Sequence, residues 1–106
     1  MKIIAFTSNS SSLKKTIDKK IEDNELKTWE ILKNDKDEVL YSHIPEQWKE
    51  RAMLKPNILN DRIEFEIKWW SKNGEPDEAT KGYITGRFVE ILMVHFRNQF
   101  TKLEIK

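Results

Sequence analysis

The chain has 106 residues, of which 38% are hydrophobic and 35% are charged, and its formal net charge at pH 7 is +1. A chain of this length can bury one core, so we expect a single globular domain over residues 1–106. The nearly balanced charge argues against a nucleic-acid partner, because such proteins usually carry a basic patch. The absence of cysteine excludes disulfides, thiolate metal sites and a cysteine nucleophile.

The first apolar run of the chain is short. It covers residues 3–6 and is followed by Thr7, Ser8 and Asn9. A secretory signal needs a longer apolar segment and a small-residue cleavage site. No stretch of the sequence approaches the ~18 apolar residues of a membrane span. We therefore expect a cytoplasmic protein without a membrane partner.

The first half of the chain predicts a strand, a helix and a hairpin. Residues 2–7 form the strand, and the polar loop 8–12 that follows supplies candidates for a helix N-cap. A helix is expected over residues 13–24, where apolar residues recur at every fourth position in a narrow stripe. Such a stripe indicates a surface helix that buries little. The segments 25–33 and 38–44 alternate in polarity around a polar turn, which is typical of a β-hairpin.

The middle of the chain predicts further strands. Residues 45–51 suit a helical turn that begins with Pro45, and residues 52–58 suit an edge strand that tolerates Pro56. Residues 62–70 alternate most clearly, which predicts one face on the core and one in water. A last strand is expected after residue 101, where Leu103 and Ile105 alternate with charged residues.

The longest predicted helix covers residues 76–99. Pro76 is expected in its first turn, and its apolar residues cover more than half of the helix circumference at about 100° per residue. A helix with only one buried side needs a ~100° apolar arc, so we expect burial on two sides, under a curled sheet or under a second subunit. Gly82 and Gly86 lie on one helix face, and we expect a strand or a tryptophan to approach them closely.

These elements follow one another in the order β-α-β-β-(turn/strand)-β-α-β. The sequence therefore predicts an α+β fold with two layers, in which two helices cover one face of a mainly antiparallel sheet. A ferredoxin-like variant with an inserted strand is the nearest common topology.

The loop Thr7–Ser12 is the first candidate site. Its residues, Thr7, Ser8, Asn9, Ser10, Ser11 and Ser12, could offer hydroxyls and backbone N–H groups to an anion at the start of a helix. Ser and Asn are also preferred at helix caps for purely local reasons. An ordinary capped turn is the better interpretation of the two.

The titratable residues indicate no catalytic or metal centre. His43 falls in a predicted strand, and His95 falls in the apolar arc of the long helix, where a core or interface residue is expected. Glu64 and Glu66 share a strand face with Arg62 and Lys68, which is typical of a solvated surface with cross-strand ion pairs. We expect no metal and no cofactor.

Tryptophan gives the clearest indication of an interaction surface. The chain has 4 tryptophans, and the neighbours Trp69 and Trp70 must point to opposite faces of a strand. With Trp69 in the core, Trp70 lies on a charged face, or it folds down over the edge at the end of the sheet. An aromatic side chain exposed on the charged face would mark an interface or a groove. The residues predicted to contribute to this surface are Trp48, Trp70, Tyr83 and His95.

The wide apolar arc and Trp70 together predict a non-enzymatic binding or assembly module that is homodimeric or binds another protein. The alternative is a small-ligand-binding protein or an enzyme that holds an anionic group at Thr7–Ser12. Tyr83, His95 and Trp29 would then line an aromatic pocket.

Overall fold

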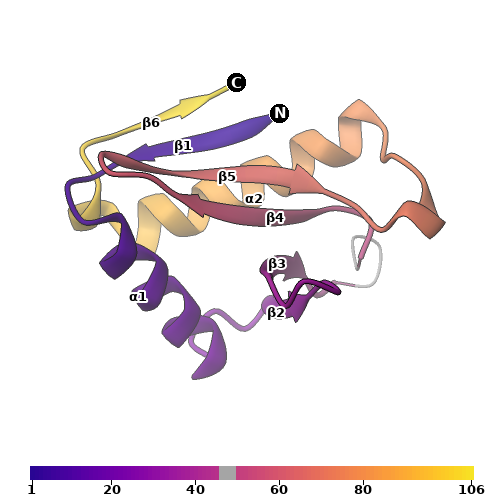
Figure 1. Cartoon of the computed structure of the whole chain (residues 1–106), viewed down its shortest axis with the longest axis horizontal. Helices are drawn as coiled ribbons and strands as arrows, with labels where there is room; N and C mark the ends of the chain where they lie inside the picture. The colour runs from indigo at the N-terminus through magenta and orange to yellow at the C-terminus, as the bar shows by residue number, and fades with distance from the viewer. Residues whose placement is uncertain (46–49) are drawn as a thin grey trace.

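The computed structural model describes residues 1–45 and 50–106. In this part of the chain, six strands form one antiparallel sheet in the order β2-β3-β4-β5-β1-β6, and two α-helices accompany it (Figure 1). The strands are β1 (Lys2–Phe6), β2 (Trp29–Lys33), β3 (Val39–His43), β4 (Met53–Ile58), β5 (Arg62–Lys68) and β6 (Lys102–Ile105). The helices are α1 (Ser10–Glu22) and α2 (Glu78–His95), with 3-10 turns at Ser71–Asn73 and Arg97–Gln99. The predicted α+β class with an antiparallel sheet is confirmed.

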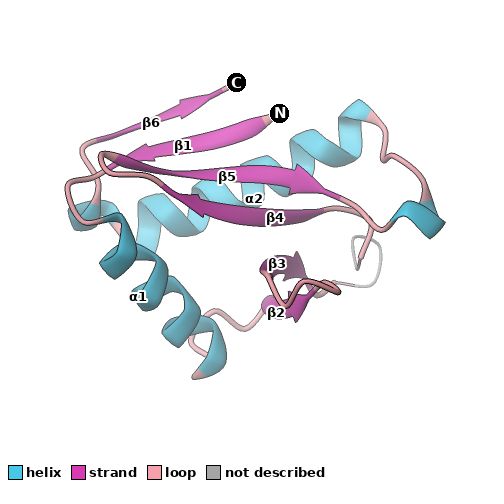
Figure 2. Ribbon diagram, viewed as in Figure 1, coloured by secondary structure: helices cyan, strands magenta, loops and turns pink. Residues whose placement is uncertain are grey.

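The sheet has a four-strand unit and an added hairpin. The elements β1, α1, β4, β5, α2 and β6 follow the chain order of a ferredoxin-like unit. The hairpin β2–β3 is inserted after α1 and joins the sheet beside β4. Figure 2 shows β2 and β3 at the end of the sheet that lies away from β6.

One face of the sheet carries the core. Ile3 lies opposite Phe65, and Tyr41 lies opposite Leu54, so alternate residues of neighbouring strands point to the same side. Their side chains form a single buried cluster with residues of both helices. The members from α1 are Leu13, Ile17 and Ile21, and those from α2 include Ile84, Phe88 and Leu92.

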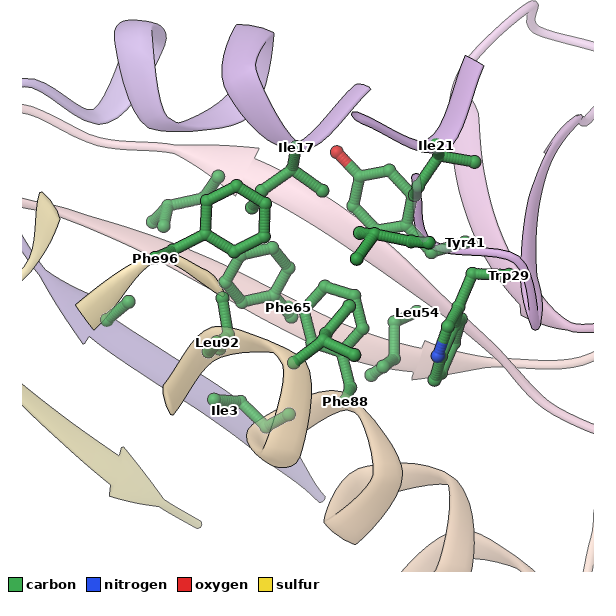
Figure 3. Close-up of a cluster of buried hydrophobic side chains, with 14 of the residues drawn as sticks. Ile3, Ile17, Ile21, Trp29, Tyr41, Leu54, Phe65, Phe88, Leu92 and Phe96 are labelled. Carbon is green, nitrogen blue, oxygen red and sulfur yellow. The ribbon is translucent and has the colours of Figure 1, made fainter. Parts of the chain in front are cut away.

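Aromatic rings occupy the centre of this cluster (Figure 3). The ring centroid of Phe88 lies 4.9 Å from that of Phe65, 5.2 Å from that of Trp29 and 5.5 Å from that of Tyr41. The hydroxyl of Tyr41 donates a hydrogen bond to the carboxylate of Asp18 on α1, which satisfies the one polar atom that this ring brings into the core. Phe88 therefore joins α2 to three strands at once.

Helix α1 begins earlier and buries more than the sequence predicts. Asn9 is its N-cap and accepts a hydrogen bond from the backbone N–H of Ser12, so the helix starts at Ser10 and not at residue 13. The predicted narrow stripe is present, but its three side chains are at most 5% exposed. The expectation that this helix buries little is wrong, since the sheet extends beneath it.

Helix α2 is shorter than predicted at both ends. Asp77 accepts a hydrogen bond from the backbone N–H of Thr80 and acts as the N-cap, which places Pro76 before the helix and not in its first turn. The α-helix ends at His95, and a 3-10 turn continues the chain. Pro76 and the acidic residues that follow it indicated the correct region for the start of the helix. The hydrogen bond to the Asp77 side chain determines which residue is the first of the helix.

Within a single chain, helix α2 is buried on one side and not on two. Ile84, Phe88 and Leu92 are completely enclosed, whereas Met93 and Val94 are 46% and 68% exposed. Gly82 and Gly86 are exposed as well, and among the described residues nothing lies within 4 Å of a Cβ built on either. The expected close approach of a strand or tryptophan to these glycines is therefore wrong.

The strand predicted at residues 52–58 corresponds to β4. β4 is not an edge strand, because it lies between β3 and β5. However, β3 pairs only with Met53 and Leu54, so at Pro56 the strand has β5 alone as its paired neighbour. A missing N–H is tolerated at such a position. The helical turn predicted for 45–51 falls largely on residues 46–49, which lie outside the described residues.

Candidate functional site

The outward side of α2 carries the residues that need an explanation. Gly82, Gly86, Val89 and Met93 follow one another at spacings of four, three and four residues, so they form one line along the helix. We call this line the outer stripe. Three of its members are exposed and Val89 is half-buried. Two glycines in a helix interior lower its stability by roughly 0.5–1 kcal/mol each relative to alanine, and nothing within the described chain requires them.

A pocket of about 320 Å³ lies between the hairpin β2–β3 and α2. Its lining comes from the hairpin and the residues flanking it, and from one side of α2. The described lining residues are Thr28, Trp29, His43, Pro45, Arg87, Glu90 and Ile91.

His43 is the polar residue enclosed in this pocket wall. It lies opposite Trp29 in the hairpin, with ring centroids 4.8 Å apart, and is 5% exposed. Its Nδ1 is buried and has no hydrogen-bond partner among the described residues. Such an orphaned buried group costs about 1–3 kcal/mol, so it needs a reason.

The surroundings of His43 favour the neutral imidazole. Burial lowers its pKa, and the nearby Arg87 guanidinium lowers it further, while Glu90 acts in the opposite direction. Arg87 and Glu90 themselves lie 3.8 Å apart (Nη1 to Oε1) and are mostly exposed. The pocket thus has aromatic walls inside and a pair of opposite charges at its mouth.

The loop Thr7–Ser12 uses its polar groups locally. The side chain of Thr7 accepts a hydrogen bond from the backbone N–H of Asn9, and the hydroxyl of Ser10 donates to the carbonyl of Leu59. Asn9 caps α1, whereas Ser8, Ser11 and Ser12 are exposed. These contacts are those of a capped turn, and the anion site remains a prediction.

The sheet face away from the core carries several ion pairs. The carboxylate of Glu64 accepts hydrogen bonds from Lys2 and Arg62, both at 2.8 Å, and these two cations hold its pKa below the ordinary value. Glu66 pairs with Lys68 at 2.9 Å. The arrangement is that of the solvated strand face expected from the sequence.

The residues of the predicted interaction surface lie in different places. Trp70 is half-buried and lines a hollow on the outer sheet face with Met53 and Lys55, and its indole N–H donates to Glu50 at 2.9 Å. Tyr83 and His95 lie on α2, which packs against the opposite face, and both are exposed. His95 is therefore not a core residue. Trp48 lies outside the described residues.

Sequence reasoning passed over His43 and misjudged the two glycines. Alternation in residues 38–44 already placed His43 on the same strand face as Tyr41, but only the register of the hairpin brings it against Trp29. For Gly82 and Gly86, the spacing showed a shared face but not that this face points to solvent.

Residues 1–45 and 50–106 contain no group of three or more His, Asp or Glu side chains that could hold a metal ion. None of the helices within these ranges is long and apolar enough to cross a membrane. Comparison with protein-family models, with curated proteins and with solved structures finds no match to any of them.

Proposed function

We propose that this protein is a non-enzymatic assembly module that forms a two-fold symmetric homodimer through the outer stripe of α2. The observation that carries the proposal is a line of two exposed glycines and the exposed Met93 on α2, with Val89 half-buried among them at the margin of the core. An isologous contact is the commonest way in which such a surface is covered. The partner is a second copy of this chain.

The spacing of the outer stripe is the same in both directions. When two copies of α2 run antiparallel, Gly82 of one helix lies opposite Met93 of the other, and Gly86 lies opposite Val89, in a single register. Each large side chain then meets a glycine, which has no side chain to displace. Glycine permits close approach of two backbones. In this one register, each of the four stripe residues in both copies therefore lies opposite a residue of complementary size.

The position of the stripe allows the contact without rearrangement of the fold. The buried residues Ile84, Phe88 and Leu92 stay on the sheet while the opposite side of α2 receives the partner. Val94, which is 68% exposed, would be partly covered at the end of the contact. A stable interface buries roughly 800 Å² per partner, so neighbouring surface must contribute beyond the stripe.

The substitution Gly86→Leu tests this contact. In the single chain a side chain at this position projects into open space, and leucine has a higher helix propensity than glycine. The variant should therefore fold at least as stably as the wild type. In the dimer, leucine would occupy the space needed by Val89 of the partner, so sedimentation equilibrium should show a monomer.

The matched control is Lys15→Leu, which adds the same side chain to an exposed position of α1. It should leave the dimer intact. A Gly86→Leu chain that dimerises as tightly as the wild type would rule out the outer stripe as the interface.

We also propose a cytoplasmic location. Small proteins of oxidising compartments are commonly rich in disulfides, and this chain has no cysteine.

A further inference from the structure

We propose that the pocket between the hairpin β2–β3 and α2 binds a small zwitterion of the free amino-acid class. The carboxylate of the ligand would lie on Arg87, its ammonium on Glu90, and its remaining part against Trp29 and His43. The described lining of this site includes no member of the outer stripe. At about 100° per residue, Arg87 lies about 100° around the helix from Gly86, whereas Glu90 lies about 40° from it, one turn further along.

The charges at the pocket mouth select a zwitterion over a simple ion. Arg87 offers the planar, multiply donating group that suits a carboxylate, but Glu90 lies 3.8 Å from it and would repel a purely anionic ligand. A ligand with both charges satisfies the two side chains together. Exposed ion pairs of this kind contribute little to folding, so the ligand can replace the direct pair at small cost.

The interior of the pocket suits a small and partly apolar ligand. Its volume of about 320 Å³ lies at the lower end of the ~300–1,000 Å³ range of small-molecule pockets. Trp29 and Ile91 form apolar walls, and both are more than nine-tenths buried. His43 brings a polar ring into this wall whose Nδ1 has no hydrogen-bond partner within the described chain.

The test is a titration of the ¹⁵N-labelled full chain with each of the standard L-amino acids, at concentrations up to about 10 mM, roughly ten times a Kd of 1 mM, and up to saturation for the poorly soluble tyrosine. At least one amino acid should shift the indole N–H signal of Trp29 and the imidazole ¹⁵N signals of His43. Its N-acetyl and carboxamide derivatives, which each lack one charge, should bind at least about tenfold more weakly.

Two variants separate the proposed contacts from a non-specific effect. Arg87→Gln and Glu90→Gln change exposed side chains, so both should fold, and each should weaken binding at least about tenfold. Arg51→Gln, an exposed arginine outside the pocket, should leave the affinity unchanged.

Three results would overturn the inference: no response to any amino acid, equal binding of the derivatives, or binding that survives both pocket variants. The same titration on Gly82→Leu separates this inference from the dimer. Leucine at this position would occupy the space needed by Met93 of the partner but lies two turns from Glu90, so the monomeric variant should still bind.

Discussion

At the scale of single residues, Phe88 lies at the centre of the aromatic part of the core. It is fully buried and contacts three aromatic rings from three strands. We expect Phe88→Ala to lower the free energy of unfolding by about 3–5 kcal/mol, because it removes a large buried ring and leaves a cavity. Urea denaturation measures this loss.

The control on the same helix is Val94→Ala, at a position that is 68% exposed. It should change stability by less than about 0.5 kcal/mol. Both substitutions, Phe88→Ala and Val94→Ala, should be made in the Gly86→Leu background, so that dimer formation does not contribute to the measured free energy of unfolding. Equal losses for the two substitutions would show that α2 does not pack on the sheet through Phe88.

His43 makes stability depend on pH below neutrality. Its pKa in the folded chain lies below the ordinary value because of burial and of Arg87, with Glu90 on α2 opposing. The unfolded chain therefore binds more protons than the folded chain as the pH falls through the ordinary histidine range near 6.5. The contribution of His43 to the free energy of unfolding is therefore highest above that pH range. It decreases as the pH falls towards the pKa that His43 has in the folded chain.

We therefore expect the midpoint of thermal unfolding to fall between about pH 7.5 and pH 5.5, and His43→Gln to flatten this slope. Differential scanning calorimetry at several pH values measures it. His95→Gln, at an exposed position on α2, is the control and should keep the wild-type slope. An unchanged slope in His43→Gln would place the pH dependence elsewhere.

Local pattern predicted the direction of many individual side chains. Strict alternation in residues 62–70 placed Ile63, Phe65 and Ile67 inside, as the structure has them, although the strand ends at Lys68 and not at residue 70. The same reasoning could not place Gly82 and Gly86, because the apolar arc of α2 is too wide to show which part faces the sheet. His95 was assigned to the buried arc for the same reason and is exposed.

At the scale of elements, the glycines of α2 are the clearest departure from what helix stability alone would select. We expect Gly82→Ala and Gly86→Ala each to raise the stability of the single chain by about 1 kcal/mol. Both positions face open space, so the added methyl group meets nothing. Thermal unfolding at high dilution should show a rise of roughly 4–8 °C in Tm for each.

Ala79→Gly provides the reverse control, because residue 79 is exposed on the same helix. It should lower stability by a similar amount. A loss of stability in Gly86→Ala at high dilution would mean that this position is already occupied in the single chain.

The start of α1 depends on Asn9. Its side chain accepts a hydrogen bond from the N–H of Ser12 at 3.4 Å, and we expect Asn9→Ala to reduce stability by about 1 kcal/mol. Ser11 is exposed and lies two residues after Asn9, in the first turn of the helix, and Ser11→Ala should have a smaller effect. Urea denaturation compares the two. Equal effects would contradict the assignment of Asn9 as the cap.

Element ends were predicted less well than element types, for a physical reason. Several residues near each helix start, such as Ser8, Asn9 and Ser10, can all act as caps. The choice among them depends on contacts from distant parts of the chain. Here Ser10 is held by the carbonyl of Leu59, which the local sequence does not reveal.

At the scale of the whole molecule, the sequence predicted an antiparallel α+β fold because hairpins and charged strand faces are local features. The position of the hairpin β2–β3 beside β4 is a long-range result, and it creates the pocket at His43. That pocket could not be predicted, since Trp29, His43 and Arg87 are far apart in the chain and meet only through the sheet order.

The proposed dimer rests on the outer stripe of α2. One side of this helix is fully used by the sheet, and the other presents glycines and apolar side chains in a line that matches itself when reversed. Association through this line should depend on protein concentration, because it is a contact between two copies.

The measurement that tests this account most directly is the solution mass of the wild-type chain, by light scattering after gel filtration at two loading concentrations. We predict a mass close to twice the 12.7 kDa of one chain at the higher concentration. A mass of 12.7 kDa at both loadings, and also in sedimentation at about 1 mM, would contradict the proposed dimer.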